Sequence, residues 1–208
     1  ITFDDTTITP SYKQRSKDQL RRMQMIYQMA DVALNPRQKI RDIIGRPLSF
    51  YFAMQGRDKS QRVSALLDMI ELGDSYADRL PSELSGGEKQ RVCIARALAA
   101  EPDLIICDEV TSALDQLVAE DILKLLQNLQ NTLGVSYLFI THDLATVKAI
   151  SDEIVVMYQG QIVEQGPREM VLNPPHHDYT ELLLSSVPEM RTDWLDSLLA
   201  ARLAKATG

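Results

Sequence analysis

The stretch LSGGEKQR, residues 84–91, is the most informative segment of this 208-residue chain. Ser85 and Glu88 have the spacing of a capping box, in which two side chains satisfy free N–H groups at the start of a helix. The two glycines between them let a ligand approach the backbone closely, and exposed N–H groups at a helix start attract anions. The stretch therefore predicts a helix from Ser85 to about Ala100. Taken alone, it fits a well-capped helix with a glycine turn as well as it fits an anion site.

A strand–helix–strand–helix pattern follows this first helix. The short apolar run LIICDE, residues 104–109, predicts a parallel strand buried on both faces. VSYLFIT, residues 135–141, predicts a second buried strand, and a helix is expected over 144–150. Between the strands an amphipathic helix closed by Gly134 is indicated by an apolar stripe at helical spacing: Val118, Ile122, Leu125, Leu126 and Leu129. This order predicts βαβ units and a parallel sheet.

The flanking segments are less regular. Residues 1–3 are a strand candidate followed by a polar turn, 16–22 are helical and strongly charged, and 23–28 (MQMIYQ) predict a buried strand. Residues 37–71 predict mixed helix with an irregular stretch around 45–56.

A β-hairpin is expected further along the chain. The sequence EIVVMY-QG-QIVEQG, residues 153–166, has strand-forming runs on both sides of Gln159-Gly160, which we place at the turn.

The composition is that of an ordinary folded protein, with 45% hydrophobic and 25% charged residues. Acidic residues number 29 against 22 basic ones, and this net charge of −7 argues against a nucleic-acid binder. Cys93 and Cys107 are far apart in apolar runs, which predicts core thiols and not a disulfide or a zinc framework. The longest apolar stretches are far below the ~18 residues that span a bilayer.

Three polar residues are predicted to lie at the carboxyl ends of the buried strands, where α/β sheets bind ligands. Asp108 would hold Mg²⁺, Glu109 would polarise a water molecule for attack on a phosphate, and His142 would donate a hydrogen bond to a transferring phosphoryl group. Taken alone, the Asp-Glu pair is better interpreted as two solvated acids at a strand end. A lone histidine after a strand is more often a capping residue.

The order of these motifs resembles the ATP-binding-cassette ATPases. Gln28 is similar to the Q-loop glutamine of that family, and LSGGEKQ is similar to its signature motif. LIICDE resembles Walker B with the following catalytic glutamate, SALD (112–115) resembles the D-loop, and His142 resembles the switch histidine. The five motifs lie in order over about 115 residues.

Further segments resemble the oligopeptide, dipeptide and nickel importer branch of that family. They are IYQMADVALNPR (26–37), QGQIVEQGP (159–167) and NPPHHDYTELLLSSVPE (173–189). The chain departs from that branch at Met29–Asp31 and at Asp178. Because no cysteine follows Cys107, the iron–sulfur cluster of some branch members is not expected here.

The resemblance implies an α/β fold: a RecA-like P-loop NTPase core with an inserted helical subdomain and a small antiparallel β element. It divides the chain into a remnant of the ATPase core ending in the Q-loop (1–33) and a helical subdomain with the signature motif (34–92). The ATPase core with Walker B, D-loop and H-loop (93–170) and a C-terminal extension (171–208) complete the division.

One motif of the family is missing from the sequence. The string G-x-x-x-x-G-K-[ST], whose backbone amides and lysine hold the β- and γ-phosphates, does not occur in residues 1–208. The chain opens on Ile1, and ITFDD resembles the interior of a protein, so we expect an N-terminally trimmed chain. The alternative is a natural cassette that has lost its nucleotide site. In either case this chain alone is expected to bind ATP poorly and to be inactive.

The resemblance also implies a set of roles. Glu109, His142 and Gln28 would be catalytic, and Asp108 and Gln28 would hold Mg²⁺. The residues expected to bind ATP are Ser85, Gly86, Gly87, Glu88, Gln90 and Asp115. The expected partners are a second cassette, identical or different, which closes head to tail over two ATP molecules, and transmembrane permease subunits.

The implied function is ATP hydrolysis coupled to import of a peptide-type solute, at the cytoplasmic side of a bacterial inner membrane. Two alternatives remain open. One is a cassette ATPase of a soluble enzyme complex, such as one for phosphonate breakdown. The other is a non-hydrolysing structural cassette.

Two features of the C-terminal part are not explained by these motifs. His176, His177 and Asp178 are adjacent, and adjacent residues rarely reach one ion without further ligands, so a polar loop is favoured over a metal site. Residues 194–203 have apolar side chains at i+4 spacing, which predicts a docked helix or a partner contact.

Overall fold

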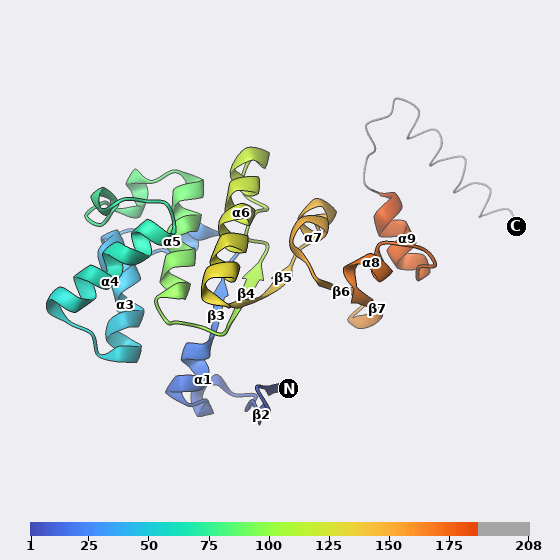
Figure 1. Ribbon diagram of the computed structural model, residues 1–208, viewed down its shortest axis with the longest axis horizontal. Coiled ribbons are helices and arrows are strands. Elements are labelled where there is room, and N and C mark those ends of the chain that lie inside the picture. Colours follow the sequence, from blue (N-terminus) through green and yellow to red (C-terminus); the bar gives the residue numbers. More distant parts are fainter. Residues whose placement is uncertain (187–208) are drawn as a thin grey trace, which may run out of the picture. The chain divides into compact units, whose positions relative to one another are not determined.

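The computed structural model describes residues 1–186, which form two compact units (Figure 1). The first unit covers Ile1–His142 and the second begins at Asp143. No helix among residues 1–186 is long and apolar enough to cross a membrane. The helix predicted over 194–203 lies outside the described residues.

The first unit is built on a parallel three-stranded sheet. Strands β3 (Met23–Ile26), β4 (Leu104–Asp108) and β5 (Ser136–Ile140) pair in the order β3-β4-β5. Met23 lies opposite Leu104, which lies opposite Ser136. Helices α5 (Gly86–Leu98) and α6 (Gln116–Leu133) lie over one face of the sheet (Figure 1). The predicted βαβ order is therefore confirmed.

The two faces of this sheet are buried to different degrees. Ile105 and Cys107 of β4 are fully buried on one face. On the other face, Leu138 and Ile140 of β5 are 51% and 49% exposed. The prediction of strands buried on both faces is therefore wrong for the described residues, because side chains alternate between faces along a strand and helices cover only one of them.

The helical part of the first unit separates β3 from β4. Helix α2 (Ala30–Ala33) is followed by α3 (Ile40–Phe52) and α4 (Gly56–Met69), and the short 3₁₀ turns η2 (Asp74–Tyr76) and η3 (Pro81–Glu83) lead into α5.

The irregular stretch predicted around residues 45–56 is mostly helix. Helix α3 runs through Gly45 and Pro47 and ends at Ala53, whose backbone is left-handed with φ 55°. Its buried side chains form one stripe that packs against α4 and α5, and this burial outweighs the weak helix preference of Gly and Pro. At Gly45 the end of the Lys59 side chain of α4 lies against α3, since a Cβ there would meet Lys59 Cε at 2.3 Å.

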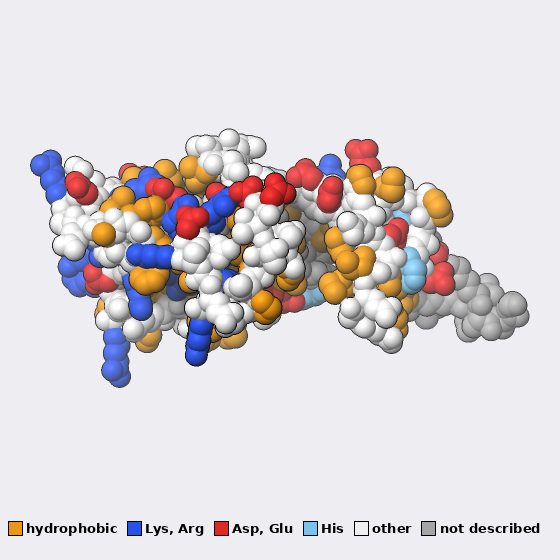
Figure 2. All heavy atoms as spheres, turned by 90° about the horizontal axis from the view of Figure 1, so that it is seen from below, with side chains coloured by type: hydrophobic (Ala, Val, Ile, Leu, Met, Phe, Trp, Pro, Cys, Tyr) orange, Lys and Arg blue, Asp and Glu red, His pale blue; other side chains and the backbone are white. Residues whose placement is uncertain are grey.

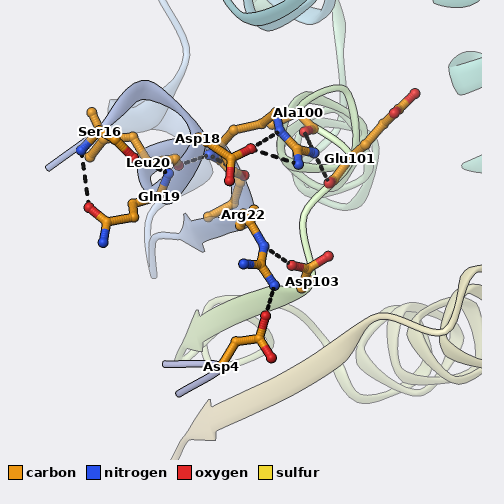
Figure 3. Close-up of polar contacts among 11 residues, drawn as sticks. Asp4, Ser16, Asp18, Gln19, Leu20, Arg22, Ala100, Glu101 and Asp103 are labelled. Atoms are coloured by element: carbon orange, nitrogen blue, oxygen red, sulfur yellow. Dashed lines mark hydrogen bonds and ion pairs between the residues drawn. The ribbon is translucent and has the colours of Figure 1, made fainter. Parts of the chain in front are cut away.

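Charged contacts hold the N-terminal segment to the sheet. Strands β1 (Thr2–Phe3) and β2 (Thr6–Thr7) form a small antiparallel hairpin, so the predicted polar turn contains a second strand. Helix α1 (Lys17–Arg22) leads directly into β3. Arg22 donates to Asp4 at 2.7 Å and also pairs with Asp103 just before β4 (Figure 3). The Arg22–Asp103 pair fastens the starts of β3 and β4 to each other, and the Arg22–Asp4 pair holds the β1–β2 hairpin to the start of β3.

The second unit carries the predicted hairpin. After α7 (Leu144–Ile150), strands β6 (Glu153–Tyr158) and β7 (Gln161–Pro167) pair antiparallel, and α8 (Arg168–Val171) and α9 (Asp178–Ser185) follow. Gln159 and Gly160 have φ of 49° and 78°, which confirms the predicted turn. His177 caps α9, with Nδ1 accepting from the Tyr179 N–H at 3.1 Å.

The two units differ in charge. Residues 143–186 contain two basic residues against seven acidic ones. Figure 2 accordingly shows Lys and Arg side chains mainly on the first unit and few on the second.

Both cysteines are core residues, as predicted. Cys93 of α5 and Cys107 of β4 are buried, and neither is in a disulfide. Burial raises the pKa of the Cys93 thiol to about 11 and that of the Cys107 thiol to about 12.

We expect Gly134→Ala to destabilise the protein by about 1–2 kcal/mol, because Gly134 ends α6 in the left-handed region with φ 69° and a Cβ is strained there. Chemical denaturation checks this. The matched control is Gly73→Ala, at φ −80° with open space around the new Cβ, which is expected to be neutral or stabilising by about 0.4–1 kcal/mol. Equal effects of the two variants on stability would contradict the left-handed backbone assigned to Gly134 at the end of α6.

Candidate functional site

Three predicted site residues meet at the carboxyl edge of the parallel sheet. Glu109 follows β4 directly, and Gln28 and His142 each lie two residues beyond the end of their strands. The Glu109 carboxylate accepts a hydrogen bond from Gln28 Nε2 at 2.5 Å through Oε2. Its Oε1 lies 2.8 Å from His142 Nδ1. The carboxylate is 25% exposed and the imidazole 77%, so the bridged carboxylate can be reached from solvent.

The backbone fixes the position of Glu109. Its φ of 47° turns the chain away from the strand direction, and its N–H donates to the Ile140 carbonyl of β5 at 2.9 Å. The Glu109 carbonyl accepts from the N–H and the hydroxyl of Ser112, at 3.1 and 3.0 Å. Ser112 Oγ also accepts from Gln28 Nε2 at 3.4 Å. Sequence reasoning missed this contact, although Ser112 opens the SALD motif.

Two oxygen groups beside this cluster suit a magnesium ion. Asp108, the last residue of β4, is half-buried, and its carboxylate has no hydrogen-bond or ion-pair partner within residues 1–186. Gln28 uses its amide nitrogen toward Glu109, which leaves its Oε1 as an acceptor. Carboxylate and amide oxygens are ligands that Mg²⁺ accepts, so the residues present fit this ion.

The capping box at the start of α5 is confirmed, and both oxygens of the Glu88 carboxylate accept hydrogen bonds. Oε2 accepts from the Ser85 N–H at 2.7 Å, and Oε1 accepts from the Tyr76 hydroxyl at 2.6 Å. The Tyr76 hydroxyl first, and then the Ser85 N–H, hold the pKa of Glu88 below its ordinary value. Both oxygens of Glu88, which we predicted to contact a nucleotide, are therefore occupied by groups of the protein itself.

The two signature glycines have different surroundings. A Cβ on Gly87 would lie 2.6 Å from Val118 Cγ1 of α6, whereas a Cβ on Gly86 would make ordinary contact with Leu114 Cδ2 at 3.6 Å. Gly87 therefore allows the close approach of α5 and α6, while Ser85 and Gly86 remain exposed.

Asp115 lies at the start of α6. It caps that helix, since its Oδ1 accepts from the Val118 N–H at 3.1 Å. Since a Cβ on Gly86 would touch Leu114 and one on Gly87 would overlap Val118, the signature motif lies beside Asp115 and the D-loop.

Gln90 lies in the interior, in contrast to its predicted contact with a nucleotide. Its side chain is 2% exposed, and its Nε2 has no hydrogen-bond partner within the described part of the chain. The reason is helical geometry, because a residue five positions after Ser85 is turned about 140° around the helix axis. The structure therefore does not bring Gln90 to the surface on which Ser85 lies.

The structure thus collects the predicted residues into two groups. Gln28, Asp108, Glu109 and His142 lie at the carboxyl edge of the sheet, and Ser85–Gly87 lie with Asp115 at the starts of α5 and α6. Their roles in binding and hydrolysis stay predictions.

Comparison with known families agrees with the motif order. The model of the ABC transporter family matches residues 1–112, more than half of the chain. The chain belongs to the ABC transporter family. A second model, for the C-terminal region of oligopeptide/dipeptide transporters, matches residues 163–206 of this ABC protein.

Several curated proteins are similar to this ABC chain. A putative peptide import ATP-binding protein of Brucella abortus (strain 2308) is 43% identical over 183 residues, which are 88% of this chain and 55% of that protein. The glutathione import ATP-binding protein GsiA of Escherichia coli K12 is 48% identical over 168 residues, 81% of this chain and 27% of that protein. The chain spans about half the length of the Brucella relative and about a quarter of the length of GsiA.

Solved cassettes share the fold. The dimeric ATP-binding cassette MJ0796, in a post-hydrolysis state bound to ADP and Pi, matches with a TM-score of 0.64 and 30% identity, over 79% of this chain and 71% of that chain. CbiO1 from Clostridium perfringens, part of the ABC transporter complex CbiONQ, matches with a TM-score of 0.72 and 26% identity, over 96% and 75%. The predicted α/β fold with a RecA-like core is confirmed.

We expect Gly87→Ala to destabilise the protein by about 1–3 kcal/mol, because the added methyl group overlaps Val118, a β-branched side chain on a packed helix. Gly86→Ala is the matched control, one residue earlier in the same helix, and its Cβ has room. Denaturation midpoints of the two variants measure the difference. A Gly87→Ala variant as stable as Gly86→Ala would show that α5 and α6 do not pack this closely.

Proposed function

We propose that this chain forms part of an ATP-hydrolysing subunit that couples ATP hydrolysis to the import of a peptide-type solute across a bacterial inner membrane. The observation that carries this proposal is the Glu109 carboxylate held between Gln28 and His142 in a chain of the ABC family. Support for import, and for the class of solute, comes from the relatives named for peptide and glutathione import and from the match to the oligopeptide/dipeptide C-terminal region.

Glu109 is the proposed general base. A carboxylate within hydrogen-bond reach of a water molecule takes up a proton as that water attacks a phosphate. Contacts with Gln28 and His142 restrict the Glu109 side chain before any nucleotide binds. His142 contacts the Glu109 carboxylate through Nδ1, which therefore carries the proton in this contact. Donation of a second hydrogen bond from Nε2 to a phosphoryl group in the transition state would require both ring nitrogens to be protonated.

Mg²⁺ and ATP are the proposed cofactor and substrate. Asp108 and the Oε1 of Gln28 would hold the ion, which when bound neutralises negative charge on the phosphate oxygens. Asp108 and Glu109 are adjacent, so the ion-binding carboxylate and the proton-accepting carboxylate share one strand end.

The signature motif is proposed to serve a second nucleotide. Ser85 and Gly86 are exposed at the start of a 13-residue helix, where N–H groups favour an anion. Ser85 and Gly86 provide N–H groups but neither a lysine side chain nor a carboxylate for a metal ion, so they form only part of a nucleotide site. We therefore propose that they close on the γ-phosphate of an ATP molecule bound by a second cassette. The dimeric state of the MJ0796 cassette supports this arrangement.

The remaining partners and the subdivision of the chain are proposals as well. Permease subunits would dock on the helical part, and the protein would lie peripherally at the cytoplasmic face of the inner membrane. The division of the chain after residues 33, 92 and 170 stays a prediction.

Glu109→Gln in the intact protein is expected to lower ATP hydrolysis by about 10²–10⁴-fold while ATP binding is retained, because the amide keeps the size of the side chain but cannot accept a proton. Phosphate release and nucleotide retention are the two measurements. Glu120→Gln is the control, since Glu120 lies exposed on α6 and pairs only with Lys124 at 2.8 Å in the described residues. Hydrolysis at the control rate in Glu109→Gln would refute the role of Glu109.

The intact unsubstituted protein tests the alternatives. No hydrolysis in the presence of its partner cassette and permease would favour a structural cassette. Stable association with soluble enzymes in place of a permease would favour a soluble complex.

A further inference from the structure

Residues 73–80, here called the connecting segment, join α4 to the signature region and cap the start of α3. Lys39, at the N-cap position of α3, makes no side-chain cap. Instead, the N–H groups of Ile40 and Arg41 donate to the carbonyls of Arg79 and Ala77, at 3.0 and 2.9 Å. The first turn of α3 therefore fixes the backbone of the connecting segment.

Side chains fasten the same segment further. Asp78 accepts from Lys39 at 2.8 Å and pairs with Arg41 at 2.9 Å, and the hydrogen bond from Lys39 holds the pKa of Asp78 below its ordinary value. The Ser64 hydroxyl of α4 donates a hydrogen bond to Asp74 Oδ1. Two helices thus hold the segment in place from both ends.

One side chain of this segment reaches the signature motif. The Tyr76 hydroxyl donates to Glu88 Oε1 at 2.6 Å, while the other carboxylate oxygen accepts the Ser85 N–H at 2.7 Å. The guanidinium carbon of Arg79 lies 3.9 Å from the centre of the Tyr76 ring, so a cation–π contact steadies the phenol. Tyr76 is half-buried.

The electrostatics of the contact agree with its geometry. The hydrogen bond is the main cause both of the lowered pKa of Glu88 and of the raised pKa of Tyr76. The donor is therefore the neutral phenol and the acceptor is the ionised carboxylate, which makes this a charge-assisted hydrogen bond.

We propose that Tyr76 is a positioning residue for the signature motif: by holding Glu88 against the Ser85 N–H, it fixes the direction in which the exposed groups of Ser85 and Gly86 meet a phosphate. This inference rests on the proposed function, in which that surface binds ATP held by a second cassette. Glu88 then acts through Ser85 and does not contact the nucleotide.

The geometry explains why the second anchor of Glu88 matters. A capping box alone holds one carboxylate oxygen of the glutamate. The side chain of a glutamate at an exposed helix start can then still rotate about its side-chain bonds. The Tyr76 hydroxyl holds the second oxygen, and α3 and α4 fix the segment that carries Tyr76. The start of α5 is thereby tied to the body of the helical part.

Tyr76→Phe in the intact protein is the first test, because it removes the hydroxyl and keeps the ring under Arg79. Without nucleotide, amide hydrogen exchange of Ser85, Glu88 and Lys89, whose N–H groups are hydrogen-bonded within the capping box and first turn, is expected to become about tenfold faster, since Glu88 is held less tightly. With ATP, the KM is expected to rise several-fold, up to about tenfold, and kcat to stay within about twofold.

Tyr12→Phe is the matched control. The Tyr12 side chain is exposed, and its hydroxyl makes no hydrogen bond within the described residues, so neither exchange nor KM should change. Unchanged exchange in Tyr76→Phe would overturn the positioning role. Faster exchange with an unchanged KM would overturn its link to the nucleotide.

The two readouts separate this inference from the proposed function. If the unsubstituted protein hydrolyses no ATP, the proposed function fails and with it the link of Tyr76 to the nucleotide. The exchange measurement still decides whether Tyr76 holds the start of α5. A fall in kcat at constant KM would also contradict the proposal, because a binding surface set out of position weakens binding first.

Discussion

The candidate site depends on the parallel pairing of β4 with both β3 and β5. Parallel strands end at the same edge, so residues that follow them meet even though they are far apart in the chain. Gln28 and Glu109 are 81 residues apart and are joined by a 2.5 Å hydrogen bond, and His142 comes from the third strand. At the opposite edge, where β3 and β4 begin, the Arg22–Asp103 ion pair joins the starts of the two strands. Loss of the strand pairing between β3, β4 and β5 would separate Gln28, Glu109 and His142.

Helix capping performs a second task at this site. Ser85 and Glu88 cap α5 and Asp115 caps α6, so polar groups are fixed at the starts of both helices by the requirements of the helices themselves. These two helix starts lie side by side because Gly87 leaves room for Val118. A surface rich in oriented polar groups therefore arises from ordinary helix termination, and little further structure is needed to present it to a ligand.

Local signals in the sequence were sufficient for most strands and helices and for placing Asp108, Glu109 and His142 at strand ends, whereas Gln28 was assigned by the family resemblance and the contact of Ser112 was missed. The strands at 104–108 and 136–140 and the glycine that ends α6 depend on neighbours within a few positions. Burial could not be predicted in the same way, because the exposure of Leu138 depends on what covers the sheet face. The continuous α3 likewise depends on packing against α4 and α5. The contact of Tyr76 with Glu88 was missed because nothing in the spacing of the two residues distinguishes it from a chance separation.

The signature motif shows how the residues of one motif divide between ligand and fold. Ser85 and Gly86 are exposed, Gly87 faces α6, Glu88 is held by Tyr76, and Gln90 is buried. In the proposed function the exposed Ser85 and Gly86 meet a phosphate, while Gly87 leaves room for α6 and Glu88 caps the helix start that presents them. A substitution at Gly87 or Glu88 that weakens nucleotide binding would therefore be no evidence of direct contact. For this reason, the string LSGGEKQ identifies the family more securely than it identifies the atoms that touch ATP.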